Sequence, residues 1–175
     1  MERGLLVGRF QPFHRGHLAV VSAIRSSRPH APLLLGIGSA QESYTAENPF
    51  TAGERTEMVE RALREARIDG CHAVPVVDIQ RHALWVAHLE SLLPPFDRIY
   101  TNNPLTRLLF ERAGYTVESP ALVDRGRMEG AQIRARMARG EEWRDRVPPA
   151  VATYLDEIHG PDRVRMLLAH VQSDR

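Results

Sequence analysis

Apolar residues follow two different spacings along this chain. Short unbroken apolar runs are typical of strands buried on both faces of a parallel sheet, and apolar residues three or four positions apart are typical of helices. The unbroken runs predict strands over residues 3–8, 32–38, 73–77, 97–101 and 115–118. The spaced segments predict helices over residues 15–26, from Thr51 through Leu63, over 82–93, from Asn103 to Gly114, and over 130–139 and 148–159.

Capping residues mark several of these helix boundaries. Thr51 and Glu54 have the spacing of a capping box, in which each side chain bonds the backbone N–H of the other residue. Asn103, which a proline follows, is a typical helix start. Gly140 and Gly160 are expected to end the two helices that precede them, because glycine readily adopts the left-handed conformation found after a helix.

The alternation of strands and helices predicts an α/β fold, namely a Rossmann-like, doubly wound parallel sheet with helices on both faces. Residues 1–175 are expected to form a single domain, with a helical C-terminal part over about residues 130–175. Ligands of such sheets bind beyond the carboxyl ends of the strands. The loops over residues 8–17, 38–48, 78–85 and 101–104 follow the first four strands, so we expect them to meet at one rim.

Charge and composition exclude several kinds of partner and catalytic chemistry. The net charge of +1 gives no general reason to expect nucleic acid or an anionic membrane as a partner. The 23 residues counted as lysine or arginine are all arginine, so a lysine nucleophile or Schiff base is excluded. Cys71 is the only cysteine, which excludes an intrachain disulfide and fits a reducing compartment.

We expect a cytoplasmic location. The first predicted strand begins directly after the N-terminal residues, so no signal peptide is expected. No apolar run approaches the length of about 20 residues that is needed to cross a bilayer. No membrane partner is therefore expected.

The segment from Gly8 to His17 is the most informative part of the sequence about function. It joins a predicted strand to a predicted helix, and the free N–H groups at a helix start attract anions. His14 and His17 are three positions apart, so we expect both to face one opening and to donate to a phosphoryl group. Pro12 stiffens the loop, and Gly16 lets a ligand approach the backbone. In the alternative interpretation, His14 only begins the helix and His17 only packs inside the protein.

This segment, G-R-F-Q-P-F-H-R-G-H, resembles the H-x-G-H signature of the nucleotidylyltransferase superfamily. In its full length it is similar to the archaeal type of nicotinamide mononucleotide (NMN) adenylyltransferase. Further segments in the same order are similar to that family: residues 36–41 (G-I-G-S-A-Q), 47–55 (E-N-P-F-T-A-G-E-R), 78–79 with 83–86, 94–97 with 103–105, and Arg134 with Met137 and Trp143. The resemblance extends to about residue 165 and so covers nearly the whole chain.

The resemblance implies that the 5′-phosphate of NMN attacks the α-phosphorus of ATP, which gives NAD and pyrophosphate. Because this nucleophile is already an anion, alignment and charge neutralisation are sufficient for catalysis. On the family pattern, His17 contacts the α-phosphate, His14 the neighbouring phosphates, and Arg9 the phosphate bridge. Arg134 is expected to hold the β- and γ-phosphates; in the alternative interpretation it is a solvated helix arginine.

The resemblance also implies which residues surround the two substrates. Those expected to bind ATP are Gly8, Phe10, Gly16, Ser39 and Asn103. Those expected to bind NMN are Asp78, Trp85 and Gln41. Mg²⁺ is expected to arrive on the ATP phosphates, and no protein metal ligands are assigned, because the sequence shows no cluster of carboxylates that would hold the ion alone.

Three of these side chains, and Arg55 of the segment 47–55, also have simpler interpretations. An indole can stack on a flat cationic pyridine ring, but Trp85 lies in an apolar helix, where a core aromatic residue is common. Asp78 can accept a hydrogen bond from a ribose hydroxyl or cap the following turn. Asn103 can contact the adenosine half or only cap its helix. Arg55 can serve a phosphate or form a salt bridge within its helix.

The sequence departs from the family pattern ahead of the late arginine. The family usually carries Ser-x-Thr there, and this chain has Glu129 and Ala131 in those places. A carboxylate beside a triphosphate repels it unless magnesium, Arg125 or Arg127 compensates. We therefore expect weaker ATP binding or slower turnover, with function retained.

Other functions and partners stay open. One is adenylyl transfer to another phosphorylated acceptor, such as phosphopantetheine or a flavin phosphate. A second is a non-catalytic nucleotide-binding protein, which only the Glu129 and Ala131 replacements favour. A third is nucleic-acid binding through the arginines of residues 125–146, although acidic residues interrupt this run. Members of the family also assemble as homo-oligomers, often hexamers, and the apolar segment 164–171 is compatible with that.

Overall fold

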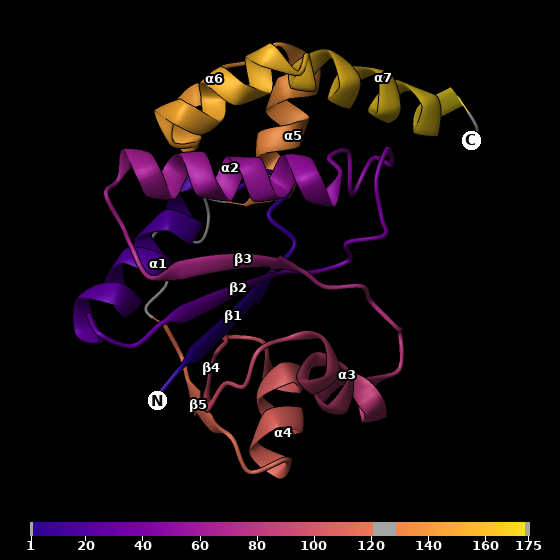
Figure 1. The fold of residues 1–175 in the computed structure, drawn as a ribbon. Coiled ribbons are helices and arrows are strands. Elements are labelled where there is room, and N and C mark those ends of the chain that lie inside the picture. The colour runs from indigo at the N-terminus through magenta and orange to yellow at the C-terminus, as the bar shows by residue number, and fades with distance from the viewer. Residues whose placement is uncertain (1, 121–128, 174–175) are drawn as a thin grey trace.

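The computed structural model describes residues 2–120 and 129–173 of the chain. Within them, one parallel sheet has five strands in the order β3-β2-β1-β4-β5 (Figure 1). The strands are β1 (Gly4–Gly8), β2 (Leu33–Ile37), β3 (Cys71–Pro75), β4 (Arg98–Tyr100) and β5 (Thr116–Glu118). This arrangement confirms the predicted doubly wound, Rossmann-like α/β fold.

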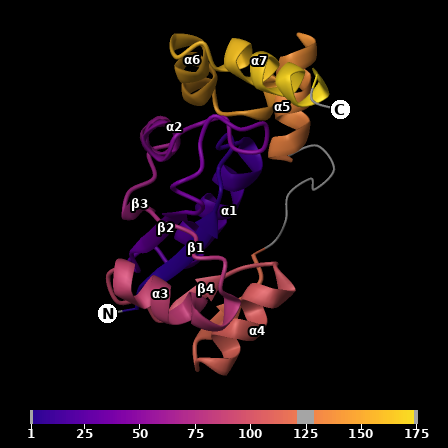
Figure 2. The same ribbon diagram turned by 90° about the vertical axis from the view of Figure 1, so that its right-hand side faces the viewer.

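Helices cover both faces of the sheet. They are α1 (Arg15–Ser27), α2 (Ala52–Glu65), α3 (Trp85–Leu92), α4 (Pro104–Arg112), α5 (Gly130–Arg139), α6 (Pro149–Glu157) and α7 (Gly160–Ser173), with short 3-10 turns η1 (His82–Leu84) and η2 (Arg144–Arg146). Helices α1 and α2 lie on one face and α3 and α4 on the other, while α5 to α7 form a further layer beside α2 (Figures 1 and 2). Across residues 2–120 and 129–173, no helix has both the length and the apolar character that spanning a bilayer requires.

Strand β2 shows why the apolar runs predicted the sheet correctly. Leu33 and Leu35 face the core under α1 and α2, and Leu34 faces the second core under α3 and α4. All three side chains are at most 1% exposed. A strand with helices on both faces needs apolar residues at every position, and this explains the unbroken run.

Three predicted boundaries are wrong. Strand β3 begins at Cys71 and ends at Pro75, two residues earlier than predicted, because its register follows β2 from Leu33 to Ile37. The single helix predicted over residues 82–93 is divided into η1 and α3. Gly160 begins α7 instead of ending the preceding helix, and a Cβ there would lie 3.0 Å from a methyl group of Leu155. Close packing against α6 therefore explains Gly160. Gly140 does end α5, with φ of 68°.

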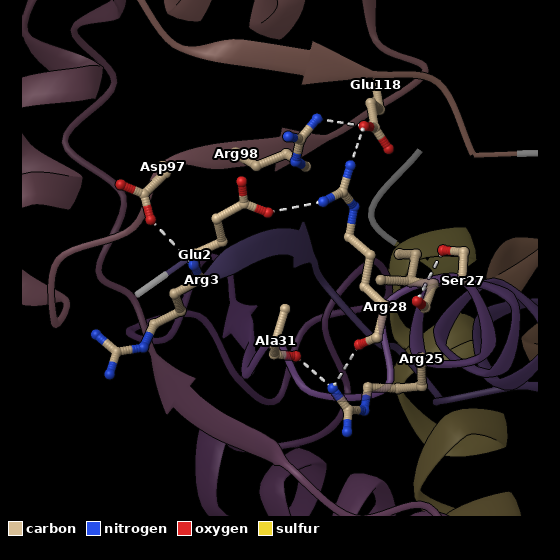
Figure 3. A network of polar contacts seen from close by, with 10 residues as sticks. Glu2, Arg3, Arg25, Ser27, Arg28, Ala31, Asp97, Arg98 and Glu118 are labelled. Atoms are coloured by element: carbon tan, nitrogen blue, oxygen red, sulfur yellow. Dashed lines mark hydrogen bonds and ion pairs between the residues drawn. The ribbon is translucent and has the colours of Figure 1, made fainter.

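A network of ion pairs connects the end of α1 to the sheet (Figure 3). Arg28, which follows α1, pairs with Glu2 at 2.8 Å and with Glu118 of β5 at 3.3 Å. Arg98 of β4 also pairs with Glu118. These charges are partly exposed, so each pair contributes modestly to stability, and the network orients α1 against β1, β4 and β5.

Candidate active site

The loops after β1, β2, β3 and β4 meet at the carboxyl edge of the sheet, as predicted, and line a cavity of about 400 Å³. Strand β1 lies between β2 and β4, where the crossover helices change from one face to the other. This is the switch point at which open α/β sheets bind ligands. The predicted site residues that line the cavity are Gly8, Arg9, Ser39, Asp78, Trp85 and Asn103.

His14 and His17 stack at the start of α1, on the α1 side of β1, with ring centroids 3.5 Å apart. The backbone N–H of His17 donates to Nδ1 of His14 at 3.3 Å, and the N–H of His14 donates to Nδ1 of His17 at 3.2 Å. The two residues therefore form a capping box, with imidazole rings in the place of the usual polar side chains. Because each Nδ1 accepts a hydrogen bond, the neutral rings carry their protons on Nε2.

Burial keeps both histidines neutral. It lowers the pKa of His14 to about 4. Burial, together with repulsion from His14, holds the pKa of His17 well below its ordinary value. At neutral pH each ring is therefore an uncharged Nε2–H donor, and a bound anion would raise both pKa values.

Two phenylalanines hold the ring of His17. The ring lies edge-on to Phe10 at 4.9 Å and stacks with Phe13 at 5.4 Å. Phe10 was expected to bind ATP, but its side chain is only 2% exposed, so only its backbone can meet a ligand. Its ring fills the space over Gly8, where a Cβ would lie 2.7 Å from a ring carbon. Gly8 is therefore required for this close approach.

Buried Arg55 joins the loops that follow β1 and β2. Its Nη1 donates to the carbonyl oxygens of Arg9 at 2.9 Å and Gly38 at 2.7 Å, and its Nη2 donates to that of Ser39 at 3.1 Å. Its side chain is fully buried. Burial, with a contribution from the nearby charge of Arg9, lowers its pKa to about 10, so it stays charged at neutral pH. Both interpretations offered for Arg55 are therefore wrong, because it bonds backbone carbonyls.

The side chain of Gln11 bonds the loop that follows β1 to the backbone of Phe50. Its Nε2 donates to the carbonyl oxygen of Phe50 at 2.8 Å, and its Oε1 accepts the N–H of Phe50 at 3.0 Å. The carbonyl oxygen of Gln11 accepts a hydrogen bond from Nη1 of Arg134 at 2.7 Å. The loop predicted to bind phosphate, residues 8–17, is thus fixed by neighbouring side chains before any substrate arrives.

Arg134 is 9% exposed, so its interpretation as a solvated helix arginine is wrong. Its Nε also donates to the carbonyl oxygen of Ala46 at 3.1 Å. Burial and the charge of Arg9 lower its pKa, and Glu47 acts in the opposite direction. Arg134 therefore lies against the predicted phosphate loop, and its contact with the β- and γ-phosphates stays a prediction.

On the other side of the cavity, Trp85 both lines the site and packs against the core under α3 and α4. The Oδ1 of Asp78 accepts the N–H of Gln80 at 3.0 Å, so Asp78 caps the turn and lines the cavity as well. Gln41 is not in the lining. Its side-chain amide bonds the backbone of Asp78 in both directions, at 2.9 and 3.1 Å. Gln41 therefore positions Asp78, and direct contact with NMN stays a prediction.

Asn103 also combines two of the proposed roles. Its Oδ1 accepts the N–H of Thr106 at 3.0 Å and so caps α4, and the residue lines the cavity. Ser39 lines the cavity with a positive φ of 48°, a conformation that costs free energy and is often found at binding sites. His14, Gly16, His17 and Arg134 are not in the lining, and the first three lie at the start of α1.

Two basic residues in the cavity lining, Arg81 and His82, were missed by the sequence analysis. Arg81 and His82 lie four and three residues before Trp85, and all three residues line the cavity. Two basic residues ahead of a rim tryptophan were the available signal. The guanidinium of Arg81 adds positive charge to the part of the site predicted to hold the pyridine ring.

The helix that carries Arg134 begins against the phosphate loop. A Cβ on Gly130 would lie 2.9 Å from the carbonyl oxygen of Gln11. Glu129 precedes it as an exposed N-cap whose side chain makes no capping hydrogen bond. Arg125 and Arg127, which were expected to compensate the repulsion between Glu129 and the triphosphate, lie outside the described residues.

The arginines that follow Arg134 form ion pairs. Arg136 and Arg139 pair with Glu141, and Arg144 pairs with Asp156 at 2.8 Å. In this part of the chain the basic run is therefore a surface of mixed charge. The absence of a nucleic-acid partner stays a prediction.

Comparisons with known proteins show the family of the chain. The model of the cytidylyltransferase-like family matches residues 5–136. The nicotinamide-nucleotide adenylyltransferase of Picrophilus torridus is 48% identical over 165 residues, which are 94% of this chain and 96% of that protein. The enzyme of the same name from Methanolobus tindarius is 47% identical, with 94% of each chain covered.

A solved structure shows the same fold. It is a bifunctional NMN adenylyltransferase/ADP ribose pyrophosphatase from Francisella tularensis, in complex with AMP and a manganese ion, and it superposes with a TM-score of 0.73 at 18% identity. The match covers 99% of this chain and 54% of that chain. With the full-length similarity described above, the chain belongs to the nicotinamide-nucleotide adenylyltransferases of the cytidylyltransferase-like family.

Proposed function

We propose that the chain transfers the adenylyl group of ATP to NMN, forming NAD and pyrophosphate, and that the start of α1 is the reaction centre. The observation that carries this assignment is the stacked pair of His14 and His17, whose hydrogen bonds leave two Nε2–H groups as donors. Neutral, preorganised donors at a helix N-terminus suit a phosphoryl group that gains charge during reaction.

In this reaction a phosphate oxygen of NMN bonds to the α-phosphorus of ATP, and the bond from that phosphorus to the leaving pyrophosphate breaks. No proton has to be removed from the nucleophile, so the histidines act as hydrogen-bond donors. His17 donates to the α-phosphate and His14 to the neighbouring phosphates. Arg9 neutralises the phosphate bridge, and no hydrogen bond or ion pair engages its guanidinium in the described part of the chain. Arg134 supports the β- and γ-phosphates.

The two nucleosides occupy different parts of the rim. The pyridine ring stacks on Trp85, and Asp78 accepts a hydrogen bond from a ribose hydroxyl, since both residues line the cavity on the α3 side. Asn103 and Ser39 support the adenosine half, which lies toward α4. Gly8 and Gly16 allow the phosphates to approach the backbone.

We further propose that Mg²⁺ arrives bound to the phosphates of ATP. Within residues 2–120 and 129–173, no three histidine, cysteine, aspartate or glutamate side chains come together in a group able to hold a metal ion. The phosphates themselves are the oxygen ligands that Mg²⁺ prefers, and it neutralises part of their charge.

We also propose that the chain forms a homo-oligomer, specifically a hexamer, and that it is located in the cytoplasm. Helix α7 packs on α5, so only part of the apolar segment 164–171 is available to another subunit. The single cysteine suits a reducing compartment.

The test is formation of NAD from ATP, NMN and Mg²⁺, detected through a coupled dehydrogenase. The variant His17→Asn tests the Nε2–H donor of His17. The asparagine oxygen can still accept the N–H of His14, but asparagine cannot place a donor where Nε2 lies. We expect kcat/KM to fall about a hundredfold or more. His30→Ala, which removes an exposed histidine before β2, should leave it within about twofold.

Two results would contradict the proposed reaction or the proposed position of its centre. ATP binding without NAD formation would indicate another phosphorylated acceptor or a non-catalytic nucleotide-binding protein. Equal activity of His17→Asn and the unaltered chain would show that the reaction centre does not lie at the start of α1.

A further inference from the structure

Arg163, in the first turn of α7, connects this helix to the start of α2 and to the segment 44–50 that precedes it (Figure 1). Its Nη1 and Nη2 donate to the two carboxylate oxygens of Glu54, at 2.7 and 2.8 Å. Nη1 also donates to the carbonyl oxygen of Pro49 at 3.3 Å, and the guanidinium lies over the ring of Tyr44 at 5.0 Å. One side chain of α7 therefore holds three residues ahead of and within the start of α2.

The ion pair of Arg163 and Glu54 is shielded from water. The two side chains are only 15% and 16% exposed. Two parallel, charge-assisted hydrogen bonds in such a place are stronger and less screened by salt than an exposed ion pair. Glu54 also accepts the N–H of Thr51 at 2.9 Å. The pair therefore fixes the first turn of α2 against α7.

The segment 44–50 in turn contacts the loop predicted to bind phosphate. Phe50, which follows the carbonyl group that Arg163 bonds, is fully buried. Its backbone N–H and carbonyl group both bond the side chain of Gln11, at 3.0 and 2.8 Å. A shift of this segment must therefore move Gln11 or break its two hydrogen bonds.

This chain of contacts leads to one half of the site. On the proposed function, the loop over residues 8–17 contacts the phosphates of ATP, whereas Trp85 and Asp78 surround the acceptor on the α3 side of the cavity. In the described part of the chain, the side-chain hydrogen bonds of Arg163 go to Pro49 and Glu54. Loss of Arg163 should therefore affect ATP and leave the acceptor largely unaffected.

We propose that Arg163 is a positioning residue for the ATP half of the site, which acts through the segment 44–50 and Gln11 on the loop over residues 8–17. The inference rests on the proposed function. Arg163 contacts neither substrate in this account. It limits the movement of the loop, so the donors of the loop stay aligned before ATP binds.

The experiment measures the Kd for ATP with Mg²⁺ by calorimetry, without an acceptor, at a temperature where circular dichroism shows every variant to be folded. Under these conditions a lower stability alone does not change the Kd. Arg163→Met keeps much of the apolar length of the side chain and removes the guanidinium. We expect it to raise the Kd for ATP about fivefold. The KM for NMN, measured through NAD formation, should stay within about twofold.

Two further variants separate positioning from general stability. Arg163→Lys can still pair with one oxygen of Glu54, so it should recover part of the loss in ATP affinity. Arg61→Met is the matched control. Arg61, further along α2, bonds both oxygens of Glu157 of α6 at 2.9 Å and lies over the ring of Tyr154 at 4.5 Å. It therefore removes the same kinds of contact from the same two layers, and the Kd for ATP should stay within about twofold.

A double variant tests the route through Gln11. Gln11→Met removes both hydrogen bonds to Phe50 and keeps similar volume. If Arg163 acts through this link, Arg163→Met should weaken ATP binding by no more than about twofold when Gln11 is already replaced. Fully additive losses would overturn the proposed route.

The remaining outcomes are distinct. An unchanged Kd for ATP in Arg163→Met, or an equal loss in Arg61→Met, overturns the inference and leaves the proposed function standing. A weaker Kd in Arg163→Met, in a chain that binds ATP but forms no NAD, supports the positioning of ATP while the proposed acceptor fails. If the unaltered chain does not bind ATP, the inference and the proposed function both fail.

Discussion

Nη1 of Arg55 donates to the carbonyl oxygen of Arg9 at 2.9 Å, so the residue that begins the phosphate loop is held from inside the protein. The same nitrogen reaches the carbonyl oxygen of Gly38, which follows β2. The guanidinium is surrounded by carbonyl oxygens and has no carboxylate partner among the residues described. Its charge is therefore used to align two loops of the site, which fixes the position from which the side chain of Arg9 extends.

Removing Arg55 tests this relationship. Arg55→Met keeps much of the apolar bulk but leaves buried carbonyl oxygens without donors, and each such loss costs about 1–3 kcal/mol. We expect the free energy of unfolding to fall by roughly 3 kcal/mol and kcat/KM for ATP to fall about tenfold or more. Urea unfolding and steady-state kinetics measure the two effects.

Arg112→Met is the matched control, since it removes an exposed arginine at the end of α4. It should change the free energy of unfolding by no more than about 0.5 kcal/mol. Equal stability of the two variants would mean that the buried carbonyl oxygens find other donors.

The contact between Gly130 and Gln11 gives a second prediction. In Gly130→Ala, the new Cβ would lie 2.9 Å from a backbone oxygen, which cannot rotate away. Helix α5 must then shift from the phosphate loop, and Arg134 shifts with it. We expect a loss of about 1–3 kcal/mol in stability and a higher KM for ATP. In the control Gly53→Ala, the nearest atom to the Cβ is 3.9 Å away, so stability should be equal or slightly higher.

The histidine pair at the start of α1 predicts how stability depends on pH. The pKa of His14 is about 4 in the folded chain and about 6.5 in the unfolded chain. Between these values the unfolded chain binds the extra proton, so the stabilisation is complete above about pH 6.5 and declines as the pH falls toward 4. His17 acts in the same direction. From pH 7 to pH 5 we expect His14 alone to remove about 2 kcal/mol from the free energy of unfolding, measured by urea titration.

His14→Asn separates this effect from other titrating groups. Asparagine can still accept the N–H of His17, but it does not titrate in this range. The loss of stability between pH 7 and pH 5 should therefore be about 2 kcal/mol smaller in the variant. An unchanged pH dependence would show that His14 is protonated in the folded chain at a near-ordinary pKa.

Local chemistry explains which features were predictable from the sequence. The apolar run of β2 specifies burial on both faces, and Thr51 and Glu54 form the predicted capping box, at 3.1 and 2.9 Å. The positions of the rim loops follow from strand order alone, because parallel strands end at the same edge. Each of these features depends on neighbouring residues or on a general rule of topology.

Features that depend on distant backbone atoms were not predictable. Arg55 donates to carbonyl oxygens 17 and 46 residues away. Because every residue has a carbonyl group, the sequence does not show which ones a distant side chain will bond. Gln41 similarly bonds the backbone of Asp78 instead of lining the cavity. Arg81 lies in the loop 78–85, which was expected at the rim, but no pattern in the sequence showed that its side chain lines the cavity.

Glu129 and Ala131 provide the last prediction. Glu129 is exposed at the start of α5, close to the loop that the triphosphate is proposed to contact, so we expect its carboxylate to repel the phosphates. The double variant Glu129→Ser/Ala131→Thr removes this charge and adds two hydroxyl groups. We expect the KM for ATP to fall about fivefold, equivalent to roughly 1 kcal/mol. Stability should change little, because serine replaces the favourable helix-end charge with an N-cap hydrogen bond.

Salt provides a check on the cause of this change. If repulsion from Glu129 weakens ATP binding, the difference between the double variant and the unaltered chain should shrink as ionic strength rises from about 0.05 M to about 0.5 M. A difference that does not depend on salt would assign the gain to the new hydroxyl groups. Glu60→Ser, an exposed glutamate of α2, should leave the KM for ATP unchanged at every salt concentration. An unchanged or higher KM in the double variant would mean that the carboxylate of Glu129 does not oppose the triphosphate.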